Sequence, residues 1–244
     1  MINFMIMGRI FAIFVGAMLA CSARAQQTVI ADPNAQLRPV KGYHGVRVSS
    51  AINLYLSQGQ EEKVVVSAKD VKLRDRIVTE VVDGILVIRL DVKPWHRLGN
   101  NKLKAYVSFT ALDQISASGA SDVYVDGVIS GDRLSLDLSG ASDFKGAIKV
   151  NELLLDQTGA SDSQITGQVG GQATIRTSGA SDVKAYDLVV DNCSVHASGA
   201  SDVRITVNRQ LDADLSGASS VYYKGEGVIR ESHSSGASEV AHKG

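Results

Sequence analysis

Apolar and polar residues alternate in short runs along most of this chain, and this pattern predicts β-strands. Leu134, Leu136 and Leu138 would lie on one side of such a strand, because successive side chains point to opposite faces. Ser135 and Asp137, which stand between them, would lie on the other side. Glycine-containing turns separate the runs, so the expected strands are short.

One tetrapeptide recurs at nearly constant spacing in the C-terminal half of the chain. Gly-Ala-Ser-Asp, or a close variant of it, occurs seven times, at steps of 18 to 21 residues. The copies begin at Gly119, Gly140, Gly159, Gly179, Gly199, Gly217 and Gly236. Such a period is typical of stacked units that each need their neighbours to bury an apolar face.

Each repeat holds two short alternating strands and two turns, which predicts an all-β fold. Coils of about 20 residues with two strands each, stacked at ~4.8 Å, form a right-handed parallel β-helix, or β-solenoid. Helical repeats are excluded because glycine and aspartate are unfavourable in helix interiors. The leucine-rich repeat and the calcium-binding nonapeptide roll are excluded because their signature spacings do not occur.

The chain divides into four segments. We expect a signal peptide over residues 1–25, a polar linker over 26–40, a β-rich N-terminal part of the solenoid over 41–110 and regular repeats over 111–243. The signal peptide has a basic residue before a short apolar run, and small residues form a cleavage site before Gln26. The alternative at this end is a lipid anchor on Cys21, because the residues before it loosely resemble a bacterial lipobox.

The repeat begins well before the clear motifs. Residues 49–56 align with residues 118–125 position by position, as a degenerate copy. Residues 79–88 are typical of a tight hairpin, and residues 70–77 of one or two helical turns. The segment 94–102 is predicted to be a loop and holds the only tryptophan.

The net charge argues against nucleic-acid binding, and the cysteine content against a disulfide-stabilised fold. The formal net charge of −1 becomes about −3 without the two arginines of the signal peptide, and no basic field suited to nucleic acid is present. Cys193 is then the only cysteine, so no intramolecular disulfide can form. Its place in an alternating strand predicts a buried, unreactive side chain.

In a stacked array, matching residues of successive coils form columns. The corner glycines are expected to adopt positive φ or to allow close backbone approach, which is a structural role. The corner acids form a second column: Asp122, Asp143, Asp162, Asp182 and Asp202. Carboxylates this close repel by roughly 1 kcal/mol in water, so something must offset the repulsion. Hydrogen bonds within each corner could do so, as could a shared divalent cation such as Ca²⁺.

A third column lies outside the strand that follows each corner. Its members are aromatic, basic or amide side chains: Tyr55, Tyr124, Lys145, Gln164, Lys184, Arg204 and Tyr222. Rings can stack on sugar faces and cations can pair with carboxylates, so this column predicts a site for an extended carbohydrate or acidic polymer. The simpler interpretation is an ordinary polar outer face, since tyrosine is common on strands.

Two further columns belong to the strand that precedes each corner. The outward one contains Asp137, Asp156, Arg176, His196, Asp214 and His233. Its acid–arginine neighbours predict an ion pair, while its histidines stand ~10 Å apart, too far for one zinc ion. The inward column is core: Ile115, Leu136, Leu155, Ile175, Val195 and Ala213. It ends in Ser232, which suggests an open C-terminal end that could pair with another copy of the chain.

The corner motif and the run Gly-Val-Arg-Val-Ser-Ser-Ala-Ile-Asn-Leu-Tyr-Leu at residues 45–56 resemble the head GIN domain family. That family is a domain of unknown function in exported proteins of Bacteroidota and relatives, described as autotransporter-adhesin-like. The resemblance covers about residues 40–243. It implies a β-helical fold and a role in adhesion, and it supplies no catalytic residues.

The sequence favours an exported, non-catalytic module of the cell envelope that needs no cofactor and presents an extended face to glycans or envelope proteins. Its acids are evenly repeated rather than clustered, and no nucleophile elbow, P-loop or zinc-protease motif occurs. A structural envelope protein without a ligand is the main alternative. A polysaccharide-active enzyme is the other, and only the loop at 94–102 offers it a cleft. Periplasmic and surface locations both fit.

Overall fold

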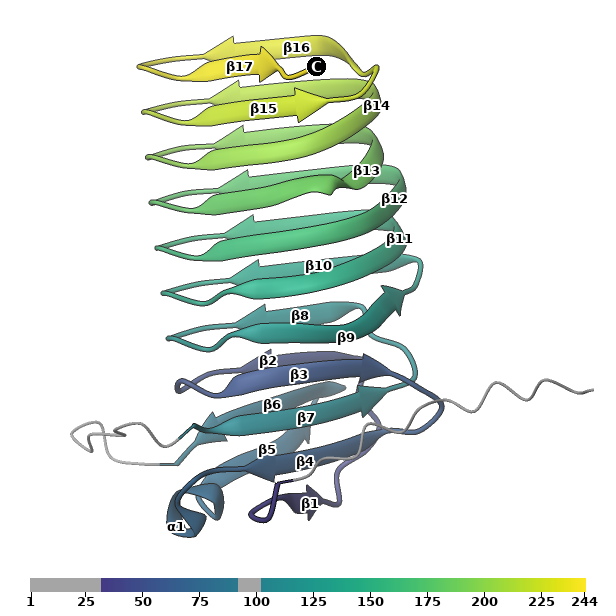
Figure 1. The fold of residues 1–244 in the computed structure, drawn as a ribbon, viewed down its shortest axis with the longest axis vertical. Helices are drawn as coiled ribbons and strands as arrows, with labels where there is room; N and C mark the ends of the chain where they lie inside the picture. Colours follow the sequence, from purple (N-terminus) through teal and green to yellow (C-terminus); the bar gives the residue numbers. More distant parts are fainter. Residues whose placement is uncertain (1–31, 92–101) are drawn as a thin grey trace, which may run out of the picture.

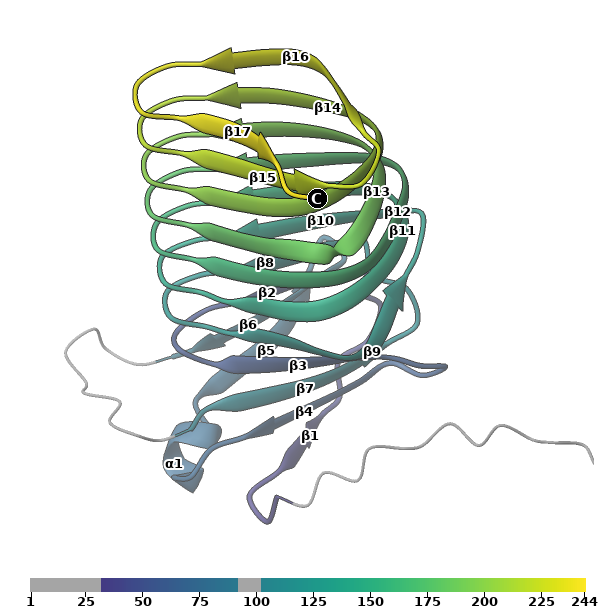
Figure 2. The same ribbon diagram turned by 45° about the horizontal axis from the view of Figure 1, so that its top comes forward.

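The computed structural model describes residues 32–91 and 102–244, and it shows a β-solenoid with strands stacked along one long axis (Figure 1). The chain rises along this axis in a right-handed sense (Figures 1 and 2), so the predicted fold class is confirmed. The predicted signal peptide, the lipid-anchor alternative and most of the 94–102 loop lie outside the described residues. Within them, no helix has the length and apolar character needed to span a membrane.

Two sheets lie back to back. The front sheet holds, from its N-terminal end, β1 (Gln36–Arg38), β4 (Lys63–Ser67), β7 (Lys104–Phe109), β3 (Asn53–Gln58), β9 (Val123–Ser130), the first halves of β11 to β14, β15 (Ser220–Lys224) and β17 (Glu239–His242). The back sheet holds β5 (Ile77–Val82), β6 (Ile85–Leu90), β2 (Gly45–Val48), β8 (Gln114–Ala117), β10 (Arg133–Leu138), the second halves of β11 to β14, and β16 (Val228–Ser234).

The regular coils differ from the expected two short strands per coil. The strands β11 (Phe144–Gln157), β12 (Asp162–Thr177), β13 (Asp182–Ala197) and β14 (Asp202–Leu215) run through both sheets. Each continues around the bend that the sequence predicted as a turn, because the ladder there resumes after local register shifts such as the one between Val150 and Glu152. In these coils only the Gly-Ala-Ser-Asp corner interrupts the strand.

The first coils do not stack in chain order. The β2–β3 coil lies between the β6–β7 coil and the β8–β9 coil, so Val46 pairs with Leu86 on one side and with Ile115 on the other. Leu54 pairs with Val123, which confirms the predicted alignment of residues 49–56 with residues 118–125. The chain therefore descends after β3 and returns upward to β8 (Figure 1).

Antiparallel strands close the N-terminal end. The strands β5 and β6 form the tight hairpin that their sequence predicts, and β4 pairs antiparallel with both β1 and β7. The single helical turn α1 (Val71–Arg74) follows Asp70, whose side chain accepts a hydrogen bond from the backbone N–H of Lys72. Among the described residues, the outermost strands at this end, β1 and β5, therefore pair antiparallel with their neighbours, unlike the strands of the repeats.

The apolar core fills the space between the two sheets. The inward column predicted from the sequence is confirmed, because each member pairs with the next, from Ile115 through Leu136 and Leu155 to Ala213. Cys193 is buried beside this column, and burial raises the pKa of its thiol to about 12. The thiol is therefore protonated at neutral pH and unreactive, as expected.

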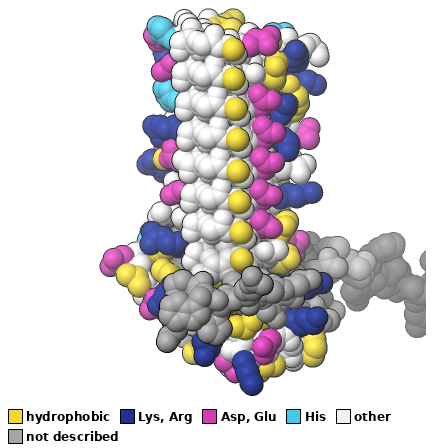
Figure 3. Space-filling model, turned by 90° about the vertical axis from the view of Figure 1, so that its left-hand side faces the viewer, with side chains coloured by type: hydrophobic (Ala, Val, Ile, Leu, Met, Phe, Trp, Pro, Cys, Tyr) yellow, Lys and Arg dark blue, Asp and Glu magenta, His cyan; other side chains and the backbone are white. Residues whose placement is uncertain are grey.

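The corners stack as closely as the strands do. The seven corner glycines have φ between 77° and 87°, and each Ala N–H from Ala141 onward donates to the glycine carbonyl one coil below, at 2.7–2.9 Å. Figure 3 faces this edge and shows an unbroken hydrophobic column beside an acidic one. The corner serines lie inside the edge; the hydroxyl of Ser181, for example, donates to the carbonyl of Ser178 at 3.1 Å.

The C-terminal end is open. The inward position that Ala213 occupies in β14 belongs to Ser232 in β16, and all seven residues of β16 are exposed. Val228 and Ile229 at the start of this strand are 66% and 43% exposed. The core therefore ends abruptly, and the strands β16 and β17 have no further strand above them within the described chain.

Candidate functional site

The outer face of the front sheet carries an uninterrupted column of aromatic and polar side chains. Its predicted members are in register: Tyr55 pairs with Tyr124, Lys145 with Gln164, and Lys184 with Arg204. The structure adds Tyr106 below Tyr55. We call this set of eight residues, from Tyr106 to Tyr222, the tyrosine–cation column.

The three N-terminal tyrosines stack on one another. The ring centroid of Tyr55 lies 5.0 Å from that of Tyr106 and 5.3 Å from that of Tyr124, with interplanar angles of 20° and 21°. Both faces of the Tyr55 ring are therefore covered by tyrosine. The column presents ring edges and hydroxyl groups to a ligand here, rather than the open ring faces that sugar stacking requires.

The C-terminal tyrosines are covered by cations instead. The Tyr222 ring has the Lys243 ammonium 4.6 Å and the Arg204 guanidinium 6.0 Å from its centroid. The Tyr186 ring has the Lys224 ammonium at 4.9 Å. These cation–π contacts order the long side chains around Tyr222 at the C-terminal end of the column.

The acid column stands directly beside this array, because each corner acid lies two residues before a column member. Lys184 lies 3.3 Å from Asp162 and 3.9 Å from Asp182, while Arg204 lies 2.9 Å from Asp202 and 3.9 Å from Asp182. The cations thus bridge neighbouring coils and offset the repulsion between carboxylates. The Asp-Val-Lys and Asp-Val-Arg spacings of the sequence place each acid and cation on the same face of a strand.

Backbone hydrogen bonds also stabilise the acids, and they join coils. The N–H of Asp162 donates to the Asp143 carboxylate one coil below, at 3.2 Å, and the N–H of Asp182 donates to Asp162 at 3.3 Å. For Asp143 and Asp162, the observed backbone hydrogen bonds therefore join neighbouring corners. Asp143 still has a raised pKa, because partial burial and the nearby acids outweigh its hydrogen bond.

Metal binding by the acid column has no geometric support in the part of the chain that the structure describes. There, no group of three or more His, Cys, Asp or Glu side chains converges as metal ligands would. The calcium hypothesis for Asp122, Asp143, Asp162, Asp182 and Asp202 therefore stays a prediction.

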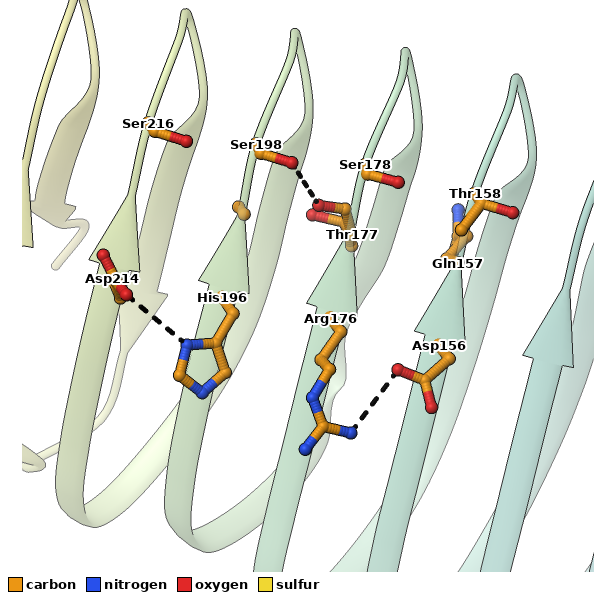
Figure 4. A pocket seen from close by; sticks show the side chains of 11 residues that line it. Asp156, Gln157, Thr158, Arg176, Thr177, Ser178, His196, Ser198, Asp214 and Ser216 are labelled. Carbon is orange, nitrogen blue, oxygen red and sulfur yellow. Dashed lines mark hydrogen bonds and ion pairs between the residues drawn. The ribbon is translucent and has the colours of Figure 1, made fainter.

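The back sheet holds a groove of about 320 Å³ (Figure 4). Its outer wall is the predicted column of Asp156, Arg176, His196 and Asp214, supplied by β11 to β14 in register. Its other wall is a row of hydroxyl groups next to the corners: Thr158, Ser178, Ser198 and Ser216. We call this the back groove. It runs along the solenoid axis and offers one charged group and one hydroxyl per coil.

In the back groove, each of the two inner side chains pairs with the acid nearer the end of the groove. The Arg176 guanidinium lies 3.5 Å from the Asp156 carboxylate, as the sequence predicted, and the His196 ring nitrogen Nδ1 lies 3.8 Å from Asp214. Figure 4 shows Arg176 leaning toward one end and His196 toward the other. The centre of the groove is thus flanked by the Arg176 guanidinium, which donates hydrogen bonds, and by the His196 ring, and its ends by two carboxylates that accept them.

The histidine of the groove is not arranged to activate a hydroxyl nucleophile. Among the described residues His196 contacts Asp214 but has no hydrogen bond to any serine, and the hydroxyl of Ser198 donates to the carbonyl of Thr177 at 3.5 Å. A Ser–His–Asp relay needs the serine within hydrogen-bond reach of the imidazole. The geometry suits binding better than acyl transfer.

The core also contains a hydrogen-bonded polar side chain that the sequence pattern does not predict. Gln157 faces inward and is fully buried, with its amide hydrogen-bonded to the carbonyls of Ser161 and Asp182 and its oxygen accepting from the hydroxyl of Ser163. These bonds tie the back sheet to the front sheet across a corner. Its column neighbours are Leu138 and Thr177, so the column pattern does not single it out.

These features define a class of protein: a long parallel β-solenoid whose outer faces repeat one set of side chains per coil. Residues 42–227 match the family model described as "Putative auto-transporter adhesin, head GIN domain". The match covers most of the chain, and the protein belongs to this family. No curated protein matches the sequence.

Solved structures show the same fold. A putative adhesin from Bacteroides fragilis has 20% identity and a TM-score of 0.72, covering 86% of this chain and 96% of its own. A putative adhesin from Parabacteroides merdae has 14% identity and a TM-score of 0.68, covering 86% and 95%. A putative lipid binding protein from Parabacteroides distasonis has 18% identity and a TM-score of 0.65, covering 87% and 98%.

Proposed function

We propose that this protein is an exported, non-catalytic binding module of the cell envelope that holds a linear glycan along the front sheet. The supporting observation is the tyrosine–cation column, which continues over eight stacked strands. Strands repeat at ~4.8 Å, close to the length of one pyranose unit in an extended chain, so successive sugars would meet equivalent side chains.

The ligand class follows from the geometry of this column. The faces of the Tyr55 ring are covered by other rings, and cations contact the Tyr222 ring. Lys184 and Arg204 are already paired with corner acids, so neutral sugars with many hydroxyl groups fit better than acidic or purely apolar ligands. Tyrosine hydroxyls, amides and paired charges can each donate or accept hydrogen bonds to such sugars. The family description as an adhesin agrees with a surface-binding role.

A glycan array with the chain from Gln26 onward tests this function. We expect binding to a neutral linear glycan and at least a tenfold loss when Tyr124, Lys184 and Arg204 are replaced by alanine. Arg133→Ala, an exposed arginine of the back sheet with only a loose contact to Glu152, is the matched control and should bind normally. An array silent for every glycan would instead favour the structural envelope role.

We further propose that the open C-terminal end pairs with a second copy of the chain. The free edges of β16 and β17, the exposed Val228 and Ile229, and the adjacent Glu231 and His233 give this end apolar area and both signs of charge. Light scattering should then show a dimer at high concentration that Val228→Lys dissociates. A monomer at every concentration would contradict the pairing.

A further inference from the structure

The centre of the back groove has an unusual charge order. Along the groove the side chains run acid, arginine, histidine, acid, from Asp156 to Asp214. Because Arg176 pairs with Asp156 and His196 pairs with Asp214, the two inner groups are drawn apart (Figure 4). A ligand oxygen placed between them would meet the donating guanidinium on one side and the imidazole ring on the other, while ligand hydroxyls at either end would meet carboxylates.

We propose that the back groove binds a glycan segment in which one carboxylate-bearing sugar is flanked by two neutral sugars. The carboxylate would lie between Arg176 and His196, where the planar guanidinium can donate two parallel hydrogen bonds to it. The hydroxyls of Ser178 and Ser198 on the facing wall would contact the same sugar. The hydroxyl groups of the neutral neighbours would donate hydrogen bonds to the carboxylates of Asp156 and Asp214.

The pattern also sets what the groove rejects. A chain with a carboxylate on every sugar would place like charges against Asp156 and Asp214, and like charges at contact distance are unfavourable. A wholly neutral glycan would leave the Arg176 guanidinium at the centre of the groove without a ligand carboxylate to pair with. The groove is therefore suited to an isolated acidic sugar, which differs from the neutral ligand proposed for the front sheet.

The titratable and charged groups around His196 are Arg176 on β12, Asp212 and Asp214 on β14, and Arg230, Glu231 and His233 on β16. Arg230 is held by Asp212 through two hydrogen bonds, so it does not compete for the ligand. Arg176 is therefore the cation available to the ligand carboxylate.

Calorimetric titration with two trisaccharides tests the proposal. The probes are glucuronic acid flanked by two glucose units, and the all-glucose trisaccharide. We expect the acidic probe to bind at least tenfold more tightly than the all-glucose probe at neutral pH. Arg176→Gln should abolish this preference, Arg176→Lys should keep part of it, and His196→Gln should weaken it. Arg133→Gln, on the same sheet outside the groove, should change nothing.

Equal affinity for the two probes, absence of binding, or an Arg133→Gln effect as large as that of Arg176→Gln would overturn the proposal. Circular dichroism and thermal melting of each variant separate loss of binding from loss of folding. The result is independent of the front sheet, because alanine replacements at Tyr124, Lys184 and Arg204 should leave this titration unchanged. Failure of the front-sheet glycan array therefore leaves the groove test valid, and the reverse also holds.

Discussion

Replacing Gly159 with alanine should destabilise the protein by about 2–5 kcal/mol, because it adds two separate penalties. Gly159 has a φ of 83°, and an L-residue with a side chain pays roughly 1–2 kcal/mol in this region. An added Cβ would also lie 2.5 Å from the carbonyl oxygen of Gly140. That oxygen accepts the N–H of Ala160 at 2.8 Å, so relieving the overlap would break the stacking of the corners.

The two penalties can be separated with a matched glycine. Gly127 has a φ of 84°, but no atom lies within 4 Å of an added Cβ. Gly127→Ala should therefore show only the conformational penalty, and urea unfolding should place its midpoint between those of the wild type and Gly159→Ala. Equal midpoints for the two variants would mean that the corners do not stack as closely as the structure shows.

Truncating Leu155 to alanine should cost about 2–5 kcal/mol, the usual range for a large-to-small change in a packed core. Leu155 is fully buried and lies in the middle of the inward column, between Leu136 and Ile175. Coils on both sides pack against it, so the cavity cannot close without disturbing the ladder on two edges.

The open end of the solenoid supplies the control for this change. Ile229→Ala removes a similar apolar group from β16, where the side chain is 43% exposed. In dilute solution, below the concentration at which two copies would pair, it should shift the unfolding midpoint only slightly. Denaturant unfolding followed by circular dichroism compares the two variants. A large loss for Ile229→Ala would show that another chain covers this end in solution, and a small loss for Leu155→Ala would contradict the packed core.

The columns could be predicted from the sequence because the corners recur at nearly equal spacing. Once coils are aligned on their glycines, parallel pairing fixes which residues are neighbours, and this is why Asp156 and Arg176 were correctly expected to meet. The same logic correctly aligned residues 49–56 with residues 118–125. It needed only local spacing and strand periodicity.

Features that depend on long-range order or side-chain rotation were missed. Tyr106 joins the tyrosine stack only because the chain descends after β3, and no local pattern encodes that reversal. The covering of the Tyr55 ring faces depends on side-chain torsions set by Tyr106 and Tyr124. The charge arrangement of the back groove depends on the side-chain orientations of Arg176 and His196, and aligning the repeats in the sequence does not give these orientations.

Cross-linking across adjacent coils tests the stacking most directly. Ser178 and Ser198 occupy neighbouring coils, since the N–H of Ser198 donates to the carbonyl of Thr177, and Ser216 lies one coil further on. Neighbouring strands are ~4.8 Å apart, within the Cα separation of about 4.4–6.8 Å that a disulfide spans, whereas two coils are ~10 Å apart. Oxidation should therefore link cysteines placed at 178 and 198 but not at 178 and 216. Equal linking of both pairs, or of neither, would contradict the register from which the columns and the groove follow.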